Sequence, residues 1–210
     1  MDIYWLGHGC FRFRGRDATV VTDPAPPTTG YRIKGVAADV VTQSSEAVEV
    51  SYRQALTGEP KFITGPGEYE IAGVLITGIR TAHDPESSDA RNVAYVFDLD
   101  DVRICHLGSI SHRPSTEDVE VIGGADVLII PVGGGKVFDA QRAAETVSLL
   151  EPKIIIPMQY QTEASTGELM PVDRFLKELG MEARAPESRL SITKSNVPAA
   201  TTVVLLNYRS

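Results

Sequence analysis

The sequence predicts an α/β protein built as a four-layer α/β/β/α sandwich, in which two β-sheets pack face to face and helices cover the outside. Two observations carry this prediction. Short strand patterns dominate the first half of the chain, whereas continuous apolar strands alternate with helical patterns in the second half. A length of 210 residues, with 42% apolar and 23% charged residues, is typical of one globular domain covering residues 1–210.

The first half opens with three β-rich runs separated by glycine-containing turns, which predicts an antiparallel meander. A loop must follow at residues 23–30, because the sequence DPAPPTTG contains three prolines. Strand patterns then continue up to residue 98. The strands expected in this half are 3–6, 10–14, 18–22, 38–42, 61–64, 68–71, 74–81 and 92–98.

The second half has β-α-β-α order. Apolar runs at 102–107, 127–132 and 153–157 have the character of strands buried on both faces. Such strands need helices on both sides, or helices on one side and a second sheet on the other. Helices are expected at 116–122, 140–150 and 172–179, and closing strands at 190–193 and 202–206.

Charge and cysteine usage limit the partners. The chain has 20 Lys and Arg against 28 Asp and Glu, a formal charge of −8, so we expect no nucleic acid and no membrane partner. Cys10 and Cys105 are too few for a disulfide scaffold, and the first residues lack an export signal. We therefore expect a cytoplasmic protein with inert, reduced thiols that is able to form a homo-oligomer.

In α/β sheets, functional groups collect on the loops beyond the carboxyl ends of the strands. Here these loops carry polar side chains that we expect to converge on one edge of the sandwich. They are His8, Asp23, residues 43–50, His83, Asp84, Ser109 and Gln159.

Ordered sequence blocks along almost the whole chain resemble the metallo-β-lactamase superfamily. Within it, the chain is similar to the small Zn-dependent hydrolases related to ascorbate-6-phosphate lactonase. The resemblance implies the α/β/β/α sandwich and an ancestral two-metal hydrolase site. The blocks are 5–11 (WLGHGCF), 22–24 (TDP), 38–42 (ADVVT), 65–70 (GPGEYE), 81–84 (TAHD), 105–108 (CHLG), 126–134 (DVLIIPVGG) and 156–160 (IPMQY).

The ligand positions of that family differ in this chain. Relatives carry an HxHxDH motif directly after the 38–42 strand, whereas residues 45–50 read SEAVEV. Ser45, Ala47 and Val50 replace the three histidines, and of the motif positions only Glu49 keeps a carboxylate. The family's next histidine is retained as His83. Ser109 stands where relatives have the bridging aspartate, and Gln159 stands where they have the last histidine. A catalytic zinc needs about three protein ligands and an open position, which this set does not supply.

We therefore expect a degenerate zinc site and a pseudoenzyme without a cofactor, whose polar cleft binds a small molecule or serves a regulatory or scaffold role. The expected metal content is none, with His83 and Glu49 as remnant ligands. The cleft residues of this hypothesis are His8, Asp23, Ser45, Glu49, His83, Ser109 and Gln159.

Three alternatives remain open. The first is a metal-dependent hydrolase of lactones, esters or phosphodiesters, in which His83 and Glu49, joined by His8, Asp23 or Asp84, hold one Zn, Mn or Fe ion. The second is metal-free hydrolysis with Ser109 or Ser45 as nucleophile. The third is a structural subunit with a vestigial cleft.

Further motifs have ordinary structural explanations. Ser111 and His112 are adjacent in sequence, whereas the members of a catalytic triad meet in space. The run 132–136 (VGGGK) lacks the spacing of a phosphate loop and is expected to be a turn before a helix. His106 lies inside an apolar strand and is expected to be a hydrogen-bonded core histidine.

Overall fold

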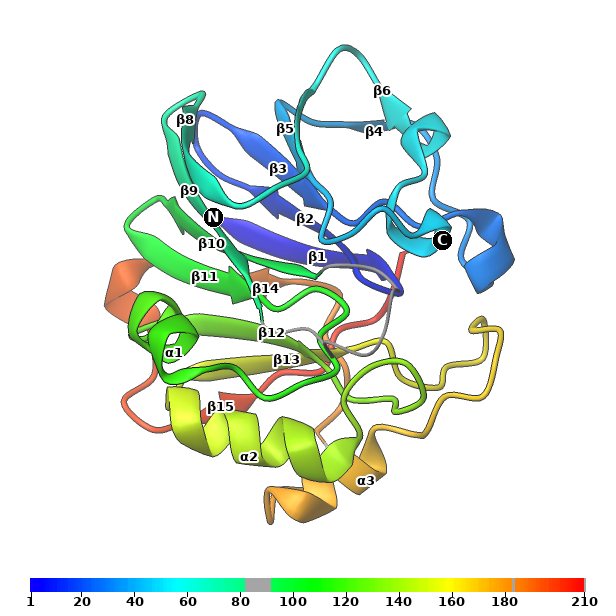
Figure 1. Cartoon of the computed structure of the whole chain (residues 1–210), viewed down its shortest axis with the longest axis vertical. Coiled ribbons are helices and arrows are strands. Elements are labelled where there is room, and N and C mark those ends of the chain that lie inside the picture. Colours follow the sequence, from blue (N-terminus) through cyan, green and yellow to red (C-terminus); the bar gives the residue numbers. More distant parts are fainter. Residues whose placement is uncertain (82–91, 183, 210) are drawn as a thin grey trace.

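The computed structural model describes residues 1–81, 92–182 and 184–209, which form two stacked β-sheets (Figure 1). This confirms the predicted sandwich. The first sheet has the strand order β14-β1-β2-β3-β5-β7, and the second has the order β15-β13-β12-β11-β10-β9-β8.

The first sheet combines an antiparallel meander with a parallel extension. β1 (Asp2–Gly7), β2 (Cys10–Arg14) and β3 (Thr19–Thr22) pair antiparallel, as the turn residues between them predict. β5 (Val40–Thr42) and β7 (Lys61–Ile63) then add in parallel, and β14 (Leu190–Ser191) closes the opposite edge.

The second sheet changes direction at β11. β8 (Gly67–Ile71), β9 (Val74–Arg80), β10 (Val93–Leu99) and β11 (Val102–His106) are antiparallel. β12 (Val127–Pro131), β13 (Ile154–Met158) and β15 (Thr202–Val203) follow in parallel. Every residue of β12 and β13 is buried, because the first sheet covers one face of these strands and helices cover the other.

Helices cover the face of the second sheet that points away from the first (Figure 1). α1 (Thr116–Ile122) begins at Ser115, whose side chain accepts a hydrogen bond from the Asp118 backbone. α2 (Ala140–Leu150) begins at Asp139 and buries one stripe of residues. α3 (Asp173–Glu178) packs beside α2. None of the helices in the described ranges is long and apolar enough to span a membrane.

The outer face of the first sheet has a different cover from the one expected. In the part of the chain that the structure describes, irregular segments and 3₁₀ turns lie there instead of an α-helix, together with the short pair β4 (Val36–Ala37) and β6 (Leu56–Thr57). The turns are η1 (Pro27–Thr29), η2 (Val48–Val50) and η3 (Arg53–Ala55). The prolines of residues 23–30 prevent a regular helix, and buried Tyr31 and Ile33 supply the apolar cover instead.

The main core lies between the sheets and under the helices. Phe13 of the first sheet meets Phe97 of the second edge to face, with ring centroids 5.3 Å apart. Cys10 and Cys105 are buried free thiols, and burial raises the pKa of both, so both stay protonated at neutral pH, as expected of inert thiols.

Candidate functional site

Polar side chains from several loops meet at one edge of the sandwich, beyond the carboxyl ends of β3, β5, β11 and β13. The β1–β2 turn lies at the centre of this edge. A methyl group on Gly9 would lie 3.0 Å from Gln159 Nε2 and 3.5 Å from Asp23 Oδ2. The Nε2 atom of His106 lies 2.9 Å from the carbonyl oxygen of Gly9. Loops far apart in the sequence are thus brought together, as expected for an α/β sheet edge.

Asp23 is a buried carboxyl held by a neighbouring serine. The backbone N–H and the hydroxyl of Ser44 donate hydrogen bonds of 2.7 Å to Oδ1 and Oδ2 of Asp23, respectively. Burial raises the pKa of Asp23 to about 7, and the hydrogen bonds from Ser44 limit this rise. Asp23 is therefore close to the midpoint of its titration at neutral pH.

His106 is a neutral core histidine, as expected from its place in an apolar strand. Its Nδ1 accepts a hydrogen bond of 3.2 Å from the Gly108 N–H, so its Nε2 carries the proton and donates to Gly9. Burial lowers the pKa of His106 to about 4. The Nδ1 atom lies 4.0 Å from Asp23 Oδ2, but two acceptors face each other there and no ion pair forms at neutral pH.

Ser109 and Gln159 touch each other at this edge. The amide Nε2 of Gln159 donates a hydrogen bond of 3.1 Å to the hydroxyl of Ser109. Gln159 is buried, whereas Ser109 is half-buried and its backbone N–H donates to Asn92 Oδ1 at 2.8 Å. Within the described ranges, Ser109 forms hydrogen bonds with Asn92 and Gln159 and with no histidine. These contacts therefore do not supply a base for a serine nucleophile.

His8 lies in the β1–β2 turn, and its carbonyl oxygen accepts a hydrogen bond of 2.9 Å from Trp5 Nε1. Burial lowers the pKa of His8 to about 4, although the negative charge of Glu49 acts in the opposite direction. His8 is thus neutral at pH 7, and Glu49 lies within its electrostatic reach.

The remaining predicted cleft residues lie further out. Glu49 is exposed in η2, and Ser45 is half-buried with its hydroxyl accepting a hydrogen bond of 3.2 Å from the Ala47 N–H. These contacts belong to a surface turn. His83 and Asp84, the other two sequence candidates, lie outside the described residues.

Three residues of this edge have left-handed backbones. His8, Asp23 and Gln159 have φ angles of 52°, 40° and 51°, a region that non-glycine residues rarely adopt. Such conformations cost roughly 1–3 kcal/mol each and cluster at functional sites. Four other non-glycine residues in the described ranges, Ala72, Asp100, Asp101 and Glu151, also have positive φ, but only at this edge do such residues meet the polar contacts described above.

Two residues of the edge were missed by sequence reasoning. Ser44, which holds Asp23, directly precedes the predicted Ser45, and the sequence does not reveal which of the two serines points inward. Asn92 occupies the first position of a predicted strand, where the β pattern alone gives it no separate role. A buried amide at the start of an apolar strand is a signal that could have found it.

The other motifs have structural roles. Ser111 Oγ and His112 Nδ1 form a hydrogen bond of 2.9 Å on the surface, outside the Asp23 edge. A methyl group on Gly133 would lie 2.0 Å from the Gln159 carbonyl oxygen, so this position of the glycine-rich run is required for packing against the β13 end.

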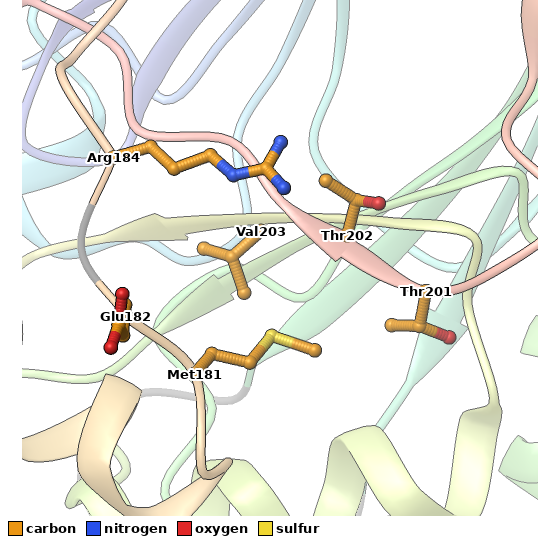
Figure 2. Close-up of a pocket in the computed structure, with 6 residues that line it drawn as sticks. All are labelled: Met181, Glu182, Arg184, Thr201, Thr202 and Val203. Carbon is orange, nitrogen blue, oxygen red and sulfur yellow. The ribbon is translucent and has the colours of Figure 1, made fainter.

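Two cavities lined by described residues lie at the opposite end of the sandwich. One, of about 280 Å³, lies beside the start of β15 and is lined by residues including Met181, Arg184 and Thr202 (Figure 2). Thr202 pairs with Ile154 at the first residue of β13, whereas Gln159 follows its last residue. The other, of about 370 Å³, includes the first residue of β1. Neither cavity contains the polar edge.

Metal donors are sparse among the residues that the structure describes. No three side chains of His, Cys, Asp or Glu in these ranges form a group that could hold a metal ion. Asp23 Oδ2 and His106 Nδ1 lie 4.0 Å apart, but the side-chain oxygen and nitrogen atoms of these two residues are already hydrogen-bonded to Ser44, Gly108 and Gly9.

Comparison with known proteins places this geometry in context. Residues 2–159 match the family model of the β-lactamase superfamily domain. The UPF0173 metal-dependent hydrolase of Thermococcus onnurineus is 33% identical over 192 residues, which cover 77% of this chain and 85% of that protein.

Solved structures agree with this match. A crystal structure from Thermotoga maritima, described as a candidate Zn-dependent hydrolase of the metallo-β-lactamase superfamily, is 36% identical, with a TM-score of 0.83 and 99% coverage of both chains. A metallo hydrolase from Ignicoccus hospitalis shares the fold at 15% identity, with a TM-score of 0.66, 91% coverage of this chain and 99% of that chain.

These similarities correct three expectations. The prediction of a non-hydrolytic pseudoenzyme with a binding or scaffold role is wrong, because the similar proteins are named metal-dependent hydrolases. The expectations of no metal and no cofactor are wrong for the same reason. The prediction treated the substitutions at the family's ligand positions as excluding any metal site. The similarity to a Zn-dependent hydrolase extends across the chain, and a different set of ligands can hold a metal ion. The superfamily itself is confirmed.

Proposed function

Because the chain belongs to the UPF0173 family of the metallo-β-lactamase superfamily, we propose that it is a metal-dependent hydrolase. The observation that carries this proposal is the match along 99% of both chains to the Thermotoga maritima structure, at 36% identity. The polar edge around Asp23 is the part of this fold that we assign to substrate.

The polar side chains at this edge can form hydrogen bonds with a small polar substrate. Ser109 and Gln159 offer a hydroxyl and an amide at the edge, and His8 offers a neutral imidazole beside them. A lactone, ester or phosphodiester presents oxygen atoms that such groups bind by hydrogen bonding. The buried pair Asp23 and Ser44 joins the loops that follow β3 and β5 at the same edge.

A metal ion, when bound, supplies an activated water in this class of enzyme. The side chains in the described ranges do not fit a metal ion by themselves, because no three His, Cys, Asp or Glu residues lie together there. Ser109 and Gln159 stand where the superfamily pattern has ligands, so we propose that the ligand set of this chain differs from that pattern, and that His83 is its unchanged member.

The test is metal analysis combined with hydrolysis. The protein is purified without chelator and without a histidine tag, and its Zn, Mn and Fe are measured. Hydrolysis is then assayed on lactone, ester and phosphodiester substrates with and without EDTA. We expect about one or more metal equivalents per chain and turnover that EDTA abolishes and added metal restores, because tight sites copurify with their ion.

A pair of histidine variants sharpens the test. His83→Ala is expected to lower the metal content to less than about half of the wild-type value. His112→Ala is the matched control, since His112 is exposed and hydrogen-bonded only to Ser111 in the recorded contacts. Metal-free protein that hydrolyses none of these substrates, even after metal is added, contradicts the proposal.

A further inference from the structure

Asn92 is the most extensively bonded side chain at the polar edge. Its carboxamide nitrogen donates hydrogen bonds of 2.9 Å to Thr81 Oγ1 and to the Leu107 carbonyl oxygen. Its carboxamide oxygen accepts a hydrogen bond of 2.8 Å from the Ser109 N–H. One buried side chain thus joins the end of β9, the start of β10 and the loop after β11.

The loop after β11 is shaped to receive this side chain. Gly108 has a φ of 64°, and a methyl group there would lie 2.5 Å from Asn92 Oδ1 and 2.5 Å from Ser44 Cβ. Only glycine allows the loop to approach both residues so closely. The next residue along the strand, Val93, donates its N–H to the Ser44 carbonyl oxygen at 2.7 Å, which ties the same point to the first sheet.

The contacts continue to the exposed side of the edge. Asn92 fixes the backbone of Ser109, and the Ser109 hydroxyl accepts the hydrogen bond from Gln159. The chemistry of a carboxamide is required here, because the site needs two donated bonds and one accepted bond from a single side chain. A carboxylate has no N–H to donate, and an aliphatic side chain makes none of these three hydrogen bonds.

We propose that Asn92 is a positioning residue of the hydrolase site, which sets the place of Ser109 and, through it, of Gln159. This inference rests on the proposed function for its consequence in catalysis. Its structural part, the control of the Ser109 loop by a buried amide, stands on the hydrogen bonds alone.

The first experiment measures hydrogen exchange, which needs no substrate. In Asn92→Ala, the exchange rate of the Ser109 amide is expected to rise at least about tenfold, the equivalent of one lost hydrogen bond. The Leu107 amide, which donates to Ile129 at 3.0 Å within the sheet, is expected to stay within about threefold of wild type. Asn207→Ala, an exposed asparagine far along the chain, serves as the control.

The second experiment measures kinetics on a substrate from the hydrolysis panel. Asn92→Ala is expected to lower kcat by about 10- to 100-fold with a smaller change in KM, because misplacing reacting groups by about 1 Å costs rates of that order. Asn207→Ala is expected to retain wild-type kcat. An inactive wild-type protein refutes the proposed function, while the exchange data still test the positioning role.

Two results overturn the proposal. One is unchanged exchange at Ser109 in folded Asn92→Ala. The other is an equal rise at Ser109 and Leu107, which indicates general loosening. If Asn92→Ala does not fold, Thr81→Val replaces it, since this change removes one hydrogen-bond partner of the Asn92 carboxamide and keeps the volume of the side chain. In Thr81→Val, the rate of amide hydrogen exchange is again expected to rise more at Ser109 than at Leu107.

Discussion

The titration of Asp23 leads to a prediction about stability that is independent of any substrate. The pKa of this buried carboxyl is raised from 3.8 to about 7. An acid with a raised pKa in the folded state stabilises the fold at low pH and loses that contribution as pH rises through the folded pKa. This rise in pKa corresponds to about 4 kcal/mol of unfolding free energy.

The perturbation is Asp23→Asn, which removes the titration and keeps the shape. An asparagine oxygen accepts from the Ser44 N–H as Oδ1 does now, and the amide nitrogen donates to the Ser44 hydroxyl. We expect the stability of wild type relative to Asp23→Asn to fall by about 4 kcal/mol between about pH 4 and about pH 7, and to be constant above that range.

Two histidines act in the opposite direction and must be separated. The pKa values of His8 and His106 are lowered to about 4, so both stabilise the fold as pH rises from about 4 to about 6.5. These contributions are present in both proteins and cancel in the difference. Only the difference between wild type and Asp23→Asn reports on Asp23.

The assay is urea unfolding followed by the fluorescence of buried Trp5, at intervals from about pH 4 to about pH 8. EDTA is present throughout, because a bound cation near the edge would itself shift the pKa of Asp23. A stability difference that stays constant over this range would refute the assignment of a raised pKa to Asp23.

Two further predictions concern the packing of the edge and of a helix end. Gly108→Ala brings a methyl group to 2.5 Å from Ser44 Cβ and is expected to destabilise the fold by about 2–3 kcal/mol. Gly124→Ala is the control, because Gly124 has a comparable φ of 78° and a methyl group there would meet no atom within 4 Å. This variant is expected to cost about 1–2 kcal/mol. Ser115→Ala removes the cap that accepts from the Asp118 N–H and is expected to cost about 1 kcal/mol in urea unfolding; an unchanged midpoint contradicts the capping role.

The strands that the sequence predicted well are those whose pattern is long and uniform. β12 and β13 are continuous apolar runs, and all their residues are buried as expected. The run at 202–206 is only partly a strand of the second sheet, because Leu205 and Leu206 pair with Glu187 after β15 ends. A sequence pattern reports that a residue is buried in an extended chain, but not which partner its backbone binds.

The site was less predictable, because a sequence pattern also does not show which partner a polar side chain contacts. The order of loops correctly suggested that Asp23, Ser109 and Gln159 share an edge, since the carboxyl ends of strands are fixed by topology. The choice between Ser44 and Ser45 depends on the direction of one side chain at the end of β5, which a serine pair does not encode. Cytoplasmic location and homo-oligomer formation stay predictions.

Strain and burial at the same edge support one explanation. Asp23 and Gln159 combine unfavourable backbone angles with buried polar groups, and both features cost stability. The non-glycine residues with left-handed backbones elsewhere in the described ranges, Ala72, Asp100, Asp101 and Glu151, are not buried, so the combination of strain with burial distinguishes the edge. The large core between the sheets offsets this cost. Polar groups that are both buried and strained at one edge support our proposal of an active site there over a vestigial cleft.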